Sequence, residues 1–343
     1  MKQHVNIPVF IPHLGCPNQC VFCNQRTISG VREFKAESVR EIIDSALSTV
    51  SAEQEAEIAF FGGSFTGIER ALMISLLEIA KEYIDRGAVS SIRLSTRPDY
   101  IDGEIIDVLK KYGVKTVELG LQSSSEEVLR ISKRGHGRDA EERASRLIVD
   151  AGLDLVGQMM IGLPGSTLES ELETARFIIN SGARYARIYP TVVFYGTELC
   201  QMAKSGLYQP LSTEEAVVRS ARVFEEFYEA GVGLIRIGLH ASENLASSDT
   251  YFGGPNHSAL GELVINEFFR ERLSRELKRM NPIGKKVTVF VARGALSKAV
   301  GQNKMNKLKL SAEFSAEINF KESDELSNYD FFVEIQERTK RCI

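Results

Sequence analysis

The sequence predicts an α/β protein: a partial or complete (β/α) barrel followed by a small C-terminal α+β module. From residue 5 to residue 193, short apolar runs alternate with longer amphipathic ones, which is the pattern of a parallel sheet covered by helices. Beyond residue 285 the order changes to strand, helix, strand, strand. A chain of 343 residues has room for one large domain and a smaller one. We expect the domains to cover residues 1–245 and 246–343.

The alternation predicts six strand–helix units in the larger domain. Strands are expected at residues 5–11, 58–61, 91–95, 116–121, 155–161 and 185–193. Helices are expected at residues 38–50, 70–86, 102–112, 125–131, 140–151 and 168–181. In barrels of parallel strands, functional residues collect at the C-terminal ends of the strands. The segments with unusual chemistry in this chain follow those ends.

The smaller domain contains a basic segment. Strands are predicted at residues 287–291, 316–320 and 331–335, with a helix at 295–310 that breaks at Gly301. Residues 278–309 contain nine Lys and Arg and no Asp or Glu. Such a segment is able to contact RNA phosphates, although a solvated basic helix explains it equally well. The run Gly301-Gln302-Asn303-Lys304 is similar to the GXXG loop of a KH domain but lacks the second glycine.

The overall composition is that of an ordinary water-soluble globular protein. Hydrophobic residues make up 43% of the chain, charged residues 26%, and the net charge is −4. No apolar run approaches the length of a membrane span, so no membrane association is expected. The first residues lead directly into a predicted strand and leave no room for a targeting peptide. We therefore expect a cytoplasmic protein, in which five cysteines do not indicate a disulfide framework.

Three cysteines within eight residues are the strongest chemical signal, and they follow the first strand. Cys16, Cys20 and Cys23 have the spacing C-x3-C-x2-C, whereas Cys200 and Cys342 lie far away in sequence. Thiolates are soft ligands suited to iron–sulfur clusters. Three thiolates would leave one iron of a four-iron cluster open, and an open coordination position is typical of a catalytic metal site.

A zinc site is the alternative reading of the same segment. His13 precedes Cys16 by three residues, and together with the three cysteines it would complete a tetrahedral site. The chain would then be a non-enzymatic zinc-binding or electron-transfer protein.

The cysteine spacing, with Phe22 directly before the third cysteine, resembles the signature of the radical S-adenosylmethionine (SAM) superfamily. The resemblance implies a [4Fe–4S] cluster whose open iron binds the amino and carboxylate groups of SAM. In that family an electron from the reduced cluster cleaves SAM to methionine and a 5′-deoxyadenosyl radical, which abstracts a hydrogen atom. It also implies a reductant protein such as flavodoxin or ferredoxin.

A glycine-rich segment, Gly62 to Gly67, follows the second strand. Glycines let the backbone approach a ligand closely, although a plain turn between strand and helix would use them too. In radical SAM enzymes a segment at this position holds the SAM amino group and usually has Glu in third place. Ser64 occupies that place here, so we expect the contact to come mainly from backbone groups.

Polar residues also follow the third, fourth and fifth strands. Arg97 offers a planar fork for a carboxylate, and nearby Asp99 is an equally good N-cap for the next helix. Glu118 inside an apolar strand must be paired or functional. The resemblance implies that Arg134 binds the SAM carboxylate, that Gln122 binds its ribose or amino acid end, and that backbone near Gln158 flanks the adenine. The expected cofactor contacts are Gly62, Gly63, Ser64, Arg97, Glu118, Gln122, Arg134 and Gln158; no catalytic residue is singled out.

One branch of the superfamily is matched by several motifs in order. The chain resembles the radical SAM domain of the catalytic subunit of Elongator, which modifies wobble uridines in tRNA, and it is also similar to oxygen-independent coproporphyrinogen oxidase. No length remains for Elongator's acetyltransferase domain, and its extra zinc cysteines are absent. The resemblance to Elongator implies RNA, and tRNA in particular, as the first expected substrate. The resemblance to the oxidase implies a tetrapyrrole-like or other small molecule as the second. The matching motifs are residues 16–23, 62–67, 96–100, 120–123, 134–136 and 188–191.

Overall fold

The structure is a computed structural model that describes residues 3–11, 14–16, 20–24, 34–51, 53–239 and 249–336. The chain divides into two compact units. Unit 1 comprises Met1–Thr213 and Glu226–Ser258, and unit 2 comprises Glu214–Glu225 and Ala259–Ile343. Helix α9 (Thr213–Glu229) contributes residues to both units.

Unit 1 contains a sheet of seven parallel strands that pair in the order in which they occur in the chain. No pairing between the first and last strands closes this sheet in the described part of the chain, so the predicted barrel is a partial one. The predicted fold class is confirmed, with one parallel strand more than the six expected. The strands are β1 (Gln3–Phe10), β2 (Gln54–Phe61), β3 (Ser91–Thr96), β4 (Val114–Gln122), β5 (Asp154–Ile161), β6 (Tyr185–Pro190) and β8 (Gly233–Ile237).

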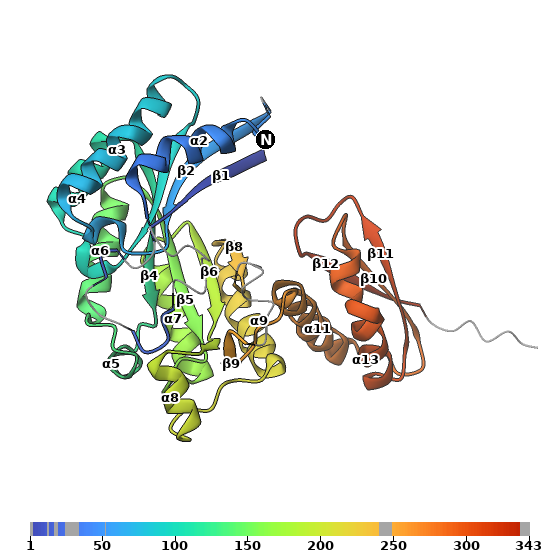
Figure 1. Ribbon diagram of the computed structural model, residues 1–343. Coiled ribbons are helices and arrows are strands. Elements are labelled where there is room, and N and C mark those ends of the chain that lie inside the picture. Colours follow the sequence, from blue (N-terminus) through green and yellow to red (C-terminus); the bar gives the residue numbers. More distant parts are fainter. Residues whose placement is uncertain are drawn as a thin grey trace, which may run out of the picture. The chain divides into compact units, whose positions relative to one another are not determined.

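Amphipathic helices connect the strands and cover one face of the sheet, and Figure 1 shows α3, α4 and α6 along that side. The strand residues that face the helices, such as Ile58, Phe60 and Leu94, are fully buried. The connecting helices are α2 (Val39–Leu47), α3 (Arg70–Asp85), α4 (Gly103–Lys111), α5 (Glu126–Ile131), α6 (Arg138–Asp150), α7 (Leu168–Asn180) and α8 (Glu198–Lys204).

The opposite face of the sheet contains a ladder of buried ion pairs. The Arg93 side chain donates to Glu57 and to Glu118, each at 2.8 Å. On the next strands, Arg187 donates to the same Glu118 at 3.0 Å. All four side chains are less than a tenth exposed, so the charges can be tolerated only because they are paired. The ladder joins β2, β3, β4 and β6 beneath the strand ends.

A short two-stranded ribbon replaces the end of the sixth predicted strand. The chain leaves the sheet after Pro190 and forms β7 (Val193–Phe194), which pairs antiparallel with β9 (Tyr251–Gly253). The predicted strand at residues 185–193 is therefore two elements, and its last residues belong to a different sheet.

Unit 2 has the predicted strand–helix–strand–strand order, preceded by a long helix that the sequence analysis did not anticipate. Its sheet has the order β11–β10–β12, in which β10 runs parallel to β11 and antiparallel to β12. Val287, Val289 and Val291 of β10 are fully buried in one core with Phe269 and Leu273 of the long helix. The elements are α11 (Leu260–Met280), β10 (Lys286–Ala292), α12 (Leu296–Val300), α13 (Met305–Glu313), β11 (Glu317–Ser323) and β12 (Phe331–Gln336). None of the described helices could cross a membrane.

Candidate cofactor site at the ends of the strands

The cysteine segment follows β1 and is fastened to three other parts of unit 1. The Leu14 carbonyl accepts from the Ser64 backbone N–H at 3.1 Å. Past Cys20, the N–H of Val21 donates to the Ser132 carbonyl at 3.2 Å, and the Val21 carbonyl accepts from the Leu199 N–H at 2.8 Å. The loop that carries the cysteines is therefore held between the glycine-rich segment, the end of α5 and the start of α8.

The glycine-rich segment lies directly against this loop, backbone to backbone. A Cβ atom on Gly63 would lie 2.5 Å from the Leu14 carbonyl oxygen, and one on Gly15 would lie 2.2 Å from that of Ser64. Neither distance is sterically possible, so both positions need glycine. The close approach fixes Ser64, which is only 1% exposed, next to the cysteine loop.

The sulfurs of Cys16 and Cys20 lie beside hydrogen-bond donors. Cys16 Sγ is 3.1 Å from the Ser64 hydroxyl, and Arg134 Nη1 donates to Cys20 Sγ at 3.2 Å. A thiolate accepts from both groups, so each would stabilise negative charge on sulfur. Among the described side chains, no three of His, Cys, Asp and Glu are already arranged around one point to hold a metal ion.

Arg134 and Arg97 form a buried pair behind the cysteines. Besides its bond to Cys20, Arg134 donates through Nη2 to the Gly120 carbonyl, and its Nε has no partner among the described residues. Arg97 donates to the Arg134 carbonyl and holds both oxygens of Asp99, at 2.9 and 3.0 Å. Because Asp99 is bound in this way, it does not cap the next helix. Asp102 caps α4 instead, which corrects that expectation.

Gln122 has an unusual backbone at the end of β4. Its φ is 71°, a left-handed value that is rare for a residue other than glycine, and the β4–β5 pairing shifts register here. Its side-chain Oε1 is buried and has no hydrogen-bond partner among the described residues. Strained backbone and an unpartnered amide oxygen mark a position that a ligand would complete.

These segments surround a cavity of about 530 Å³. All of the predicted site residues line it except Glu118, which lies deeper and accepts from the Gln158 side chain at 2.7 Å. Six further lining residues are not among the predicted ligands and cofactor contacts, and each of them is next to a cysteine or close to the end of a strand. The lining residues are Cys16, Cys20, Phe22, Cys23, Asn24, Gly62, Gly63, Ser64, Ser95, Thr96, Arg97, Gly120, Gln122, Arg134, Gln158 and Gly196.

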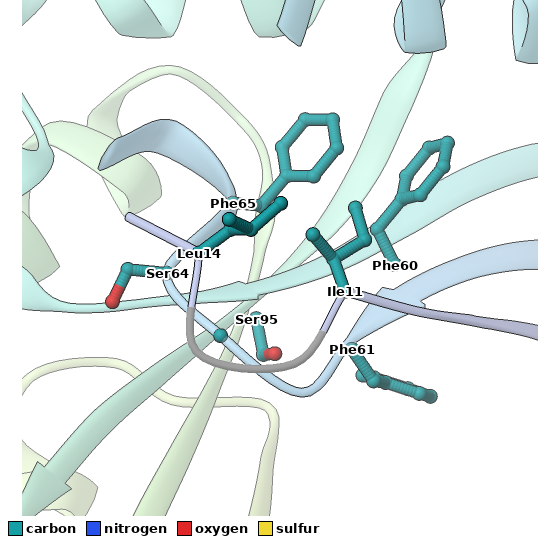
Figure 2. Close-up of a pocket in the computed structure, with 8 residues that line it drawn as sticks. Ile11, Leu14, Phe60, Phe61, Ser64, Phe65 and Ser95 are labelled. Carbon is teal, nitrogen blue, oxygen red and sulfur yellow. The ribbon is translucent and has the colours of Figure 1, made fainter. Parts of the chain in front are cut away.

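A small dry hollow lies on the other side of Ser64, and Figure 2 shows its lining. The rings of Phe60 and Phe65 stack at 4.6 Å and point to one side of the strand, whereas Phe61 points to the other. The hollow has no room for a water molecule. Packing on this side therefore supports the glycine-rich segment without offering Ser64 a competing solvent partner.

His136, from the same run as Arg134, lies in a buried polar cluster. Its Nδ1 is 3.7 Å from Glu141 Oε1 on α6, too far for a hydrogen bond, and no described residue satisfies either group. Burial lowers the pKa of His136 to about 4, and the Arg134 charge adds to this effect. Burial also raises the pKa of Glu141 well above its ordinary value. Burial therefore favours the neutral form of both side chains.

Comparison with known proteins identifies the family. The profile of the radical SAM superfamily matches residues 10–178, and that of the radical SAM C-terminal domain matches residues 183–270. The chain belongs to the radical SAM superfamily. The predicted family and enzyme class are thereby confirmed. The family's cofactors are a [4Fe–4S] cluster and SAM.

Individual relatives agree with the predicted branch. The chain is 37% identical to tRNA uridine(34) acetyltransferase of Methanocaldococcus infernus over 36% of this chain and 24% of that protein. It is 34% identical to human Elongator complex protein 3 over 42% of this chain and 27% of that protein. The chain thus matches about a quarter of the length of these two curated relatives.

A solved structure of a similar protein shows the same fold. Elp3 from M. infernus, with residues 1–46 deleted, aligns with a TM-score of 0.58 and 22% identity over 82% of this chain and 64% of that chain. Coproporphyrinogen III oxidase (HemN) from Escherichia coli aligns with a TM-score of 0.47 and 16% identity over 67% of this chain and 53% of that chain.

The cavity residues fit the radical SAM cofactors. Cys16, Cys20 and Cys23 line one cavity and offer the thiolates that an iron–sulfur cluster takes. The unpartnered Nε of Arg134 suits a carboxylate, and the unpartnered Oε1 of Gln122 suits an ammonium or hydroxyl donor. These are the two kinds of group at the amino acid end of SAM. His13 lies outside the described residues, so the zinc alternative is left to metal analysis.

Proposed function

We propose that this radical SAM enzyme modifies RNA, with tRNA as the leading substrate. The observation that carries the RNA part is the 37% identity, over 127 residues, to a protein named for its action on tRNA uridine 34. That match covers 36% of this chain. The proposal takes the substrate class from this relative, and it does not take the acetyl transfer.

The basic turn of unit 2 supports an RNA substrate. Residues 301–304 connect the two short helices α12 and α13, and Gly301, Asn303 and Lys304 all have positive φ values. Lys304 occupies the fourth position of this turn, which is the position of the second glycine in a GXXG loop. Its backbone is left-handed, a conformation that a glycine adopts easily. In KH domains such a loop between two helices holds the nucleic acid backbone.

The positive charge available to RNA is concentrated around this turn. Several other cations of the basic segment face carboxylates: Lys278 lies 3.7 Å from Glu313, and Lys286 lies 3.5 Å from Glu317. Lys304 and Lys309, by contrast, are exposed and have no ion pair among the described residues. Phosphate groups therefore find their most accessible partners at the turn and on α13.

The cavity of unit 1 would hold the cofactors. In this proposal Cys16, Cys20 and Cys23 bind the cluster, and Arg134 and Gln122 orient the amino acid end of SAM. When bound, the cluster and SAM supply the hydrogen-abstraction chemistry of the family. The protein's own residues bind and orient these groups, and both arginines that line the cavity are buried.

A small-molecule substrate is the second candidate. The 530 Å³ cavity falls within the range of small-molecule binding sites, about 300–1,000 Å³. A tetrapyrrole-like or other compact substrate would need to share this space with SAM.

The release of 5′-deoxyadenosine tests the choice between these substrates. The protein is reconstituted with iron and sulfide and reduced under strict anaerobiosis. It is then assayed with SAM alone, with bulk small RNA, and with the same RNA after ribonuclease digestion. We expect release to rise with intact RNA and to fall to the SAM-only rate after digestion.

Variants identify the source of the activity. Cys16→Ser, Cys20→Ser and Cys23→Ser should each lose the cluster and the release, whereas Cys200→Ser should keep both, because the buried Cys200 packs among apolar side chains and does not line the cavity. Cys342 lies outside the described residues, and Cys342→Ser is likewise expected to keep iron. Slow release that ignores RNA would contradict the RNA substrate and favour the small molecule. One zinc per chain in place of iron would contradict the cluster.

A further inference from the structure

An exposed aromatic pair lies at the edge of the cofactor cavity, and neither ring is among the residues expected to hold the cofactors. Tyr195 is 42% exposed and Phe252 is 40% exposed. Their rings meet edge to face, with centroids 6.3 Å apart and planes at 84°. The Lys204 ammonium lies 5.6 Å from the Tyr195 ring and 6.0 Å from the Phe252 ring.

The pair is connected to the cavity through its neighbours in the chain. Gly196, the residue after Tyr195, lines the cavity. Asn24, the residue after Cys23, also lines it and donates through Nδ2 to the Tyr195 carbonyl at 3.3 Å. The aromatic pair is therefore placed beside the third predicted cluster ligand.

The local fold holds these rings outward. In the β7–β9 ribbon, Val193 and Phe194 are buried and provide the packing. The Tyr195 N–H donates to the Thr250 carbonyl at 3.2 Å, which ties the two sides of the ribbon together next to the rings. The ribbon therefore packs through Val193 and Phe194, and Tyr195 and Phe252 remain exposed to solvent.

Exposed aromatic rings with a cation beside them are the elements with which proteins bind single-stranded nucleic acids. Each base has a flat π face that stacks on an aromatic ring, and a lysine binds the adjoining phosphate. We propose that Tyr195, Phe252 and Lys204 form a stacking site that holds one unpaired RNA nucleotide at the edge of the cofactor cavity. This inference rests on the proposed RNA substrate. It requires an unpaired nucleotide, because the faces of bases inside a duplex are already covered.

The composition of the chain offers a direct probe of stacking. The sequence contains no tryptophan, so Tyr195→Trp introduces a single indole at the site. The probe ligand is a 12-nucleotide single-stranded RNA of mixed sequence, with the same RNA in a duplex for comparison. We expect the single strand to quench the indole emission and the duplex to leave it nearly unchanged, while affinity stays equal to that of the wild-type protein or increases.

Removal of each group should weaken binding of the single strand, measured by fluorescence anisotropy with labelled RNA. Tyr195→Ala and Phe252→Ala should each weaken it roughly 5- to 150-fold, the range for loss of one stacked base. Lys204→Gln should weaken it less and reduce the slope of log affinity against log salt by about 0.7. The control is Leu207→Ala, which removes an apolar side chain that is 77% exposed but belongs to no aromatic pair, and it should bind like the wild type.

Failure of this inference and failure of the proposed function give different results. If the wild-type protein binds the single strand and Tyr195→Ala and Phe252→Ala bind equally well, the stacking site is wrong while the RNA substrate stands. Indole emission that does not change on binding leads to the same conclusion. If the wild-type protein binds neither RNA and RNA leaves 5′-deoxyadenosine release unchanged, the RNA substrate itself is wrong.

Discussion

At the scale of single residues, Ser64 is the clearest departure from the family pattern. A glutamate, usual at this place in the family, is not able to donate a hydrogen bond once ionised, whereas the Ser64 hydroxyl lies 3.1 Å from Cys16 Sγ. Because hydrogen bonds to the sulfurs stabilise the more negative, reduced cluster, Ser64 should raise its reduction potential. We expect Ser64→Ala to lower the reduction potential of the cluster in the absence of SAM. A tenfold change in the reduction equilibrium corresponds to a shift of about 59 mV.

A redox titration followed by electron paramagnetic resonance measures this shift. Ser95→Ala is the matched control, because Ser95 lines the same cavity and has no hydrogen bond to a cysteine among the described residues. Ser64→Thr keeps the hydroxyl and should stay close to the wild-type potential. An unchanged potential in Ser64→Ala would show that this hydroxyl does not act on the cluster.

His136 and Glu141 should give stability a pH dependence of opposite signs. The folded protein holds His136 neutral down to about pH 4, whereas the unfolded chain takes up a proton near pH 6.5. The unfolded state therefore binds more protons between these values, and stability should fall as the pH is lowered through this range, by up to about 3 kcal/mol. The raised pKa of Glu141 has the reverse effect: stability should fall as the pH rises above about 4.5.

Urea unfolding between pH 4 and pH 8 separates the two contributions. His136→Gln should lose less stability than the wild type below pH 6.5, and Glu141→Gln should lose less above pH 4.5. Parallel pH profiles for the wild type and both variants would mean that neither group titrates differently in the folded and unfolded chains.

The residues of the site could be predicted only in part. The cysteines, the glycines, Arg97 and Arg134 are residue types with few roles at strand ends, so the sequence was sufficient to name them. The bonds that they form were not predictable. Arg97 pairs with Asp99, two residues away, because of the local turn between them. The spacing of the two residues in the sequence does not indicate this side-chain geometry.

At the scale of elements, α8 connects the cysteine loop to the rest of unit 1. The Thr197 side chain caps this helix by accepting from the Cys200 N–H at 3.2 Å, and the Leu199 N–H of the same first turn donates to the Val21 carbonyl. We expect Thr197→Ala to lower the free energy of unfolding by about 1 kcal/mol. We also expect it to speed the loss of iron to a chelator, because the loop loses part of its support.

A second capping variant provides the control. Asp102 caps α4 by accepting from the Ile105 N–H at 2.8 Å. Asp102→Ala should therefore cost a similar free energy of unfolding, yet leave the rate of iron loss unchanged. Equal rates of iron loss in the two variants would show that α8 does not support the cysteine loop.

Elements were predictable where their periodicity was strong. The first five strands and their helices follow clear apolar patterns, and each was expected within a few residues of its observed bounds. Helix α8 (Glu198–Lys204) is not among the predicted helices. The β7–β9 ribbon was missed because it pairs residues 193–194 with 251–253, a contact that no local pattern encodes.

At the scale of the whole molecule, the described structure confirms the predicted partial barrel and the small C-terminal module. Of the side chains in the buried ion-pair ladder, the sequence indicates only Glu118, because a glutamate inside an apolar strand must be paired or functional. Its partners come from three other strands, and Arg93 and Arg187 lie 94 residues apart in sequence. Strand alternation places such side chains on one face, but only the order of strands in the sheet shows which of them meet.

This ladder should be the largest single electrostatic contribution to the stability of unit 1. Glu118 accepts from Arg93, Arg187 and Gln158 at 2.7–3.0 Å and is 1% exposed. Glu118→Gln leaves two buried guanidinium groups short of a negative partner, so we expect a loss of about 3 kcal/mol in the free energy of unfolding. The exposed carboxylate of Glu104, which also pairs with an arginine, gives the matched control: Glu104→Gln should cost less than about 1 kcal/mol. Similar urea midpoints for the two variants would show that the ladder does not hold the strands together, and that its charges are screened as if they were on the surface.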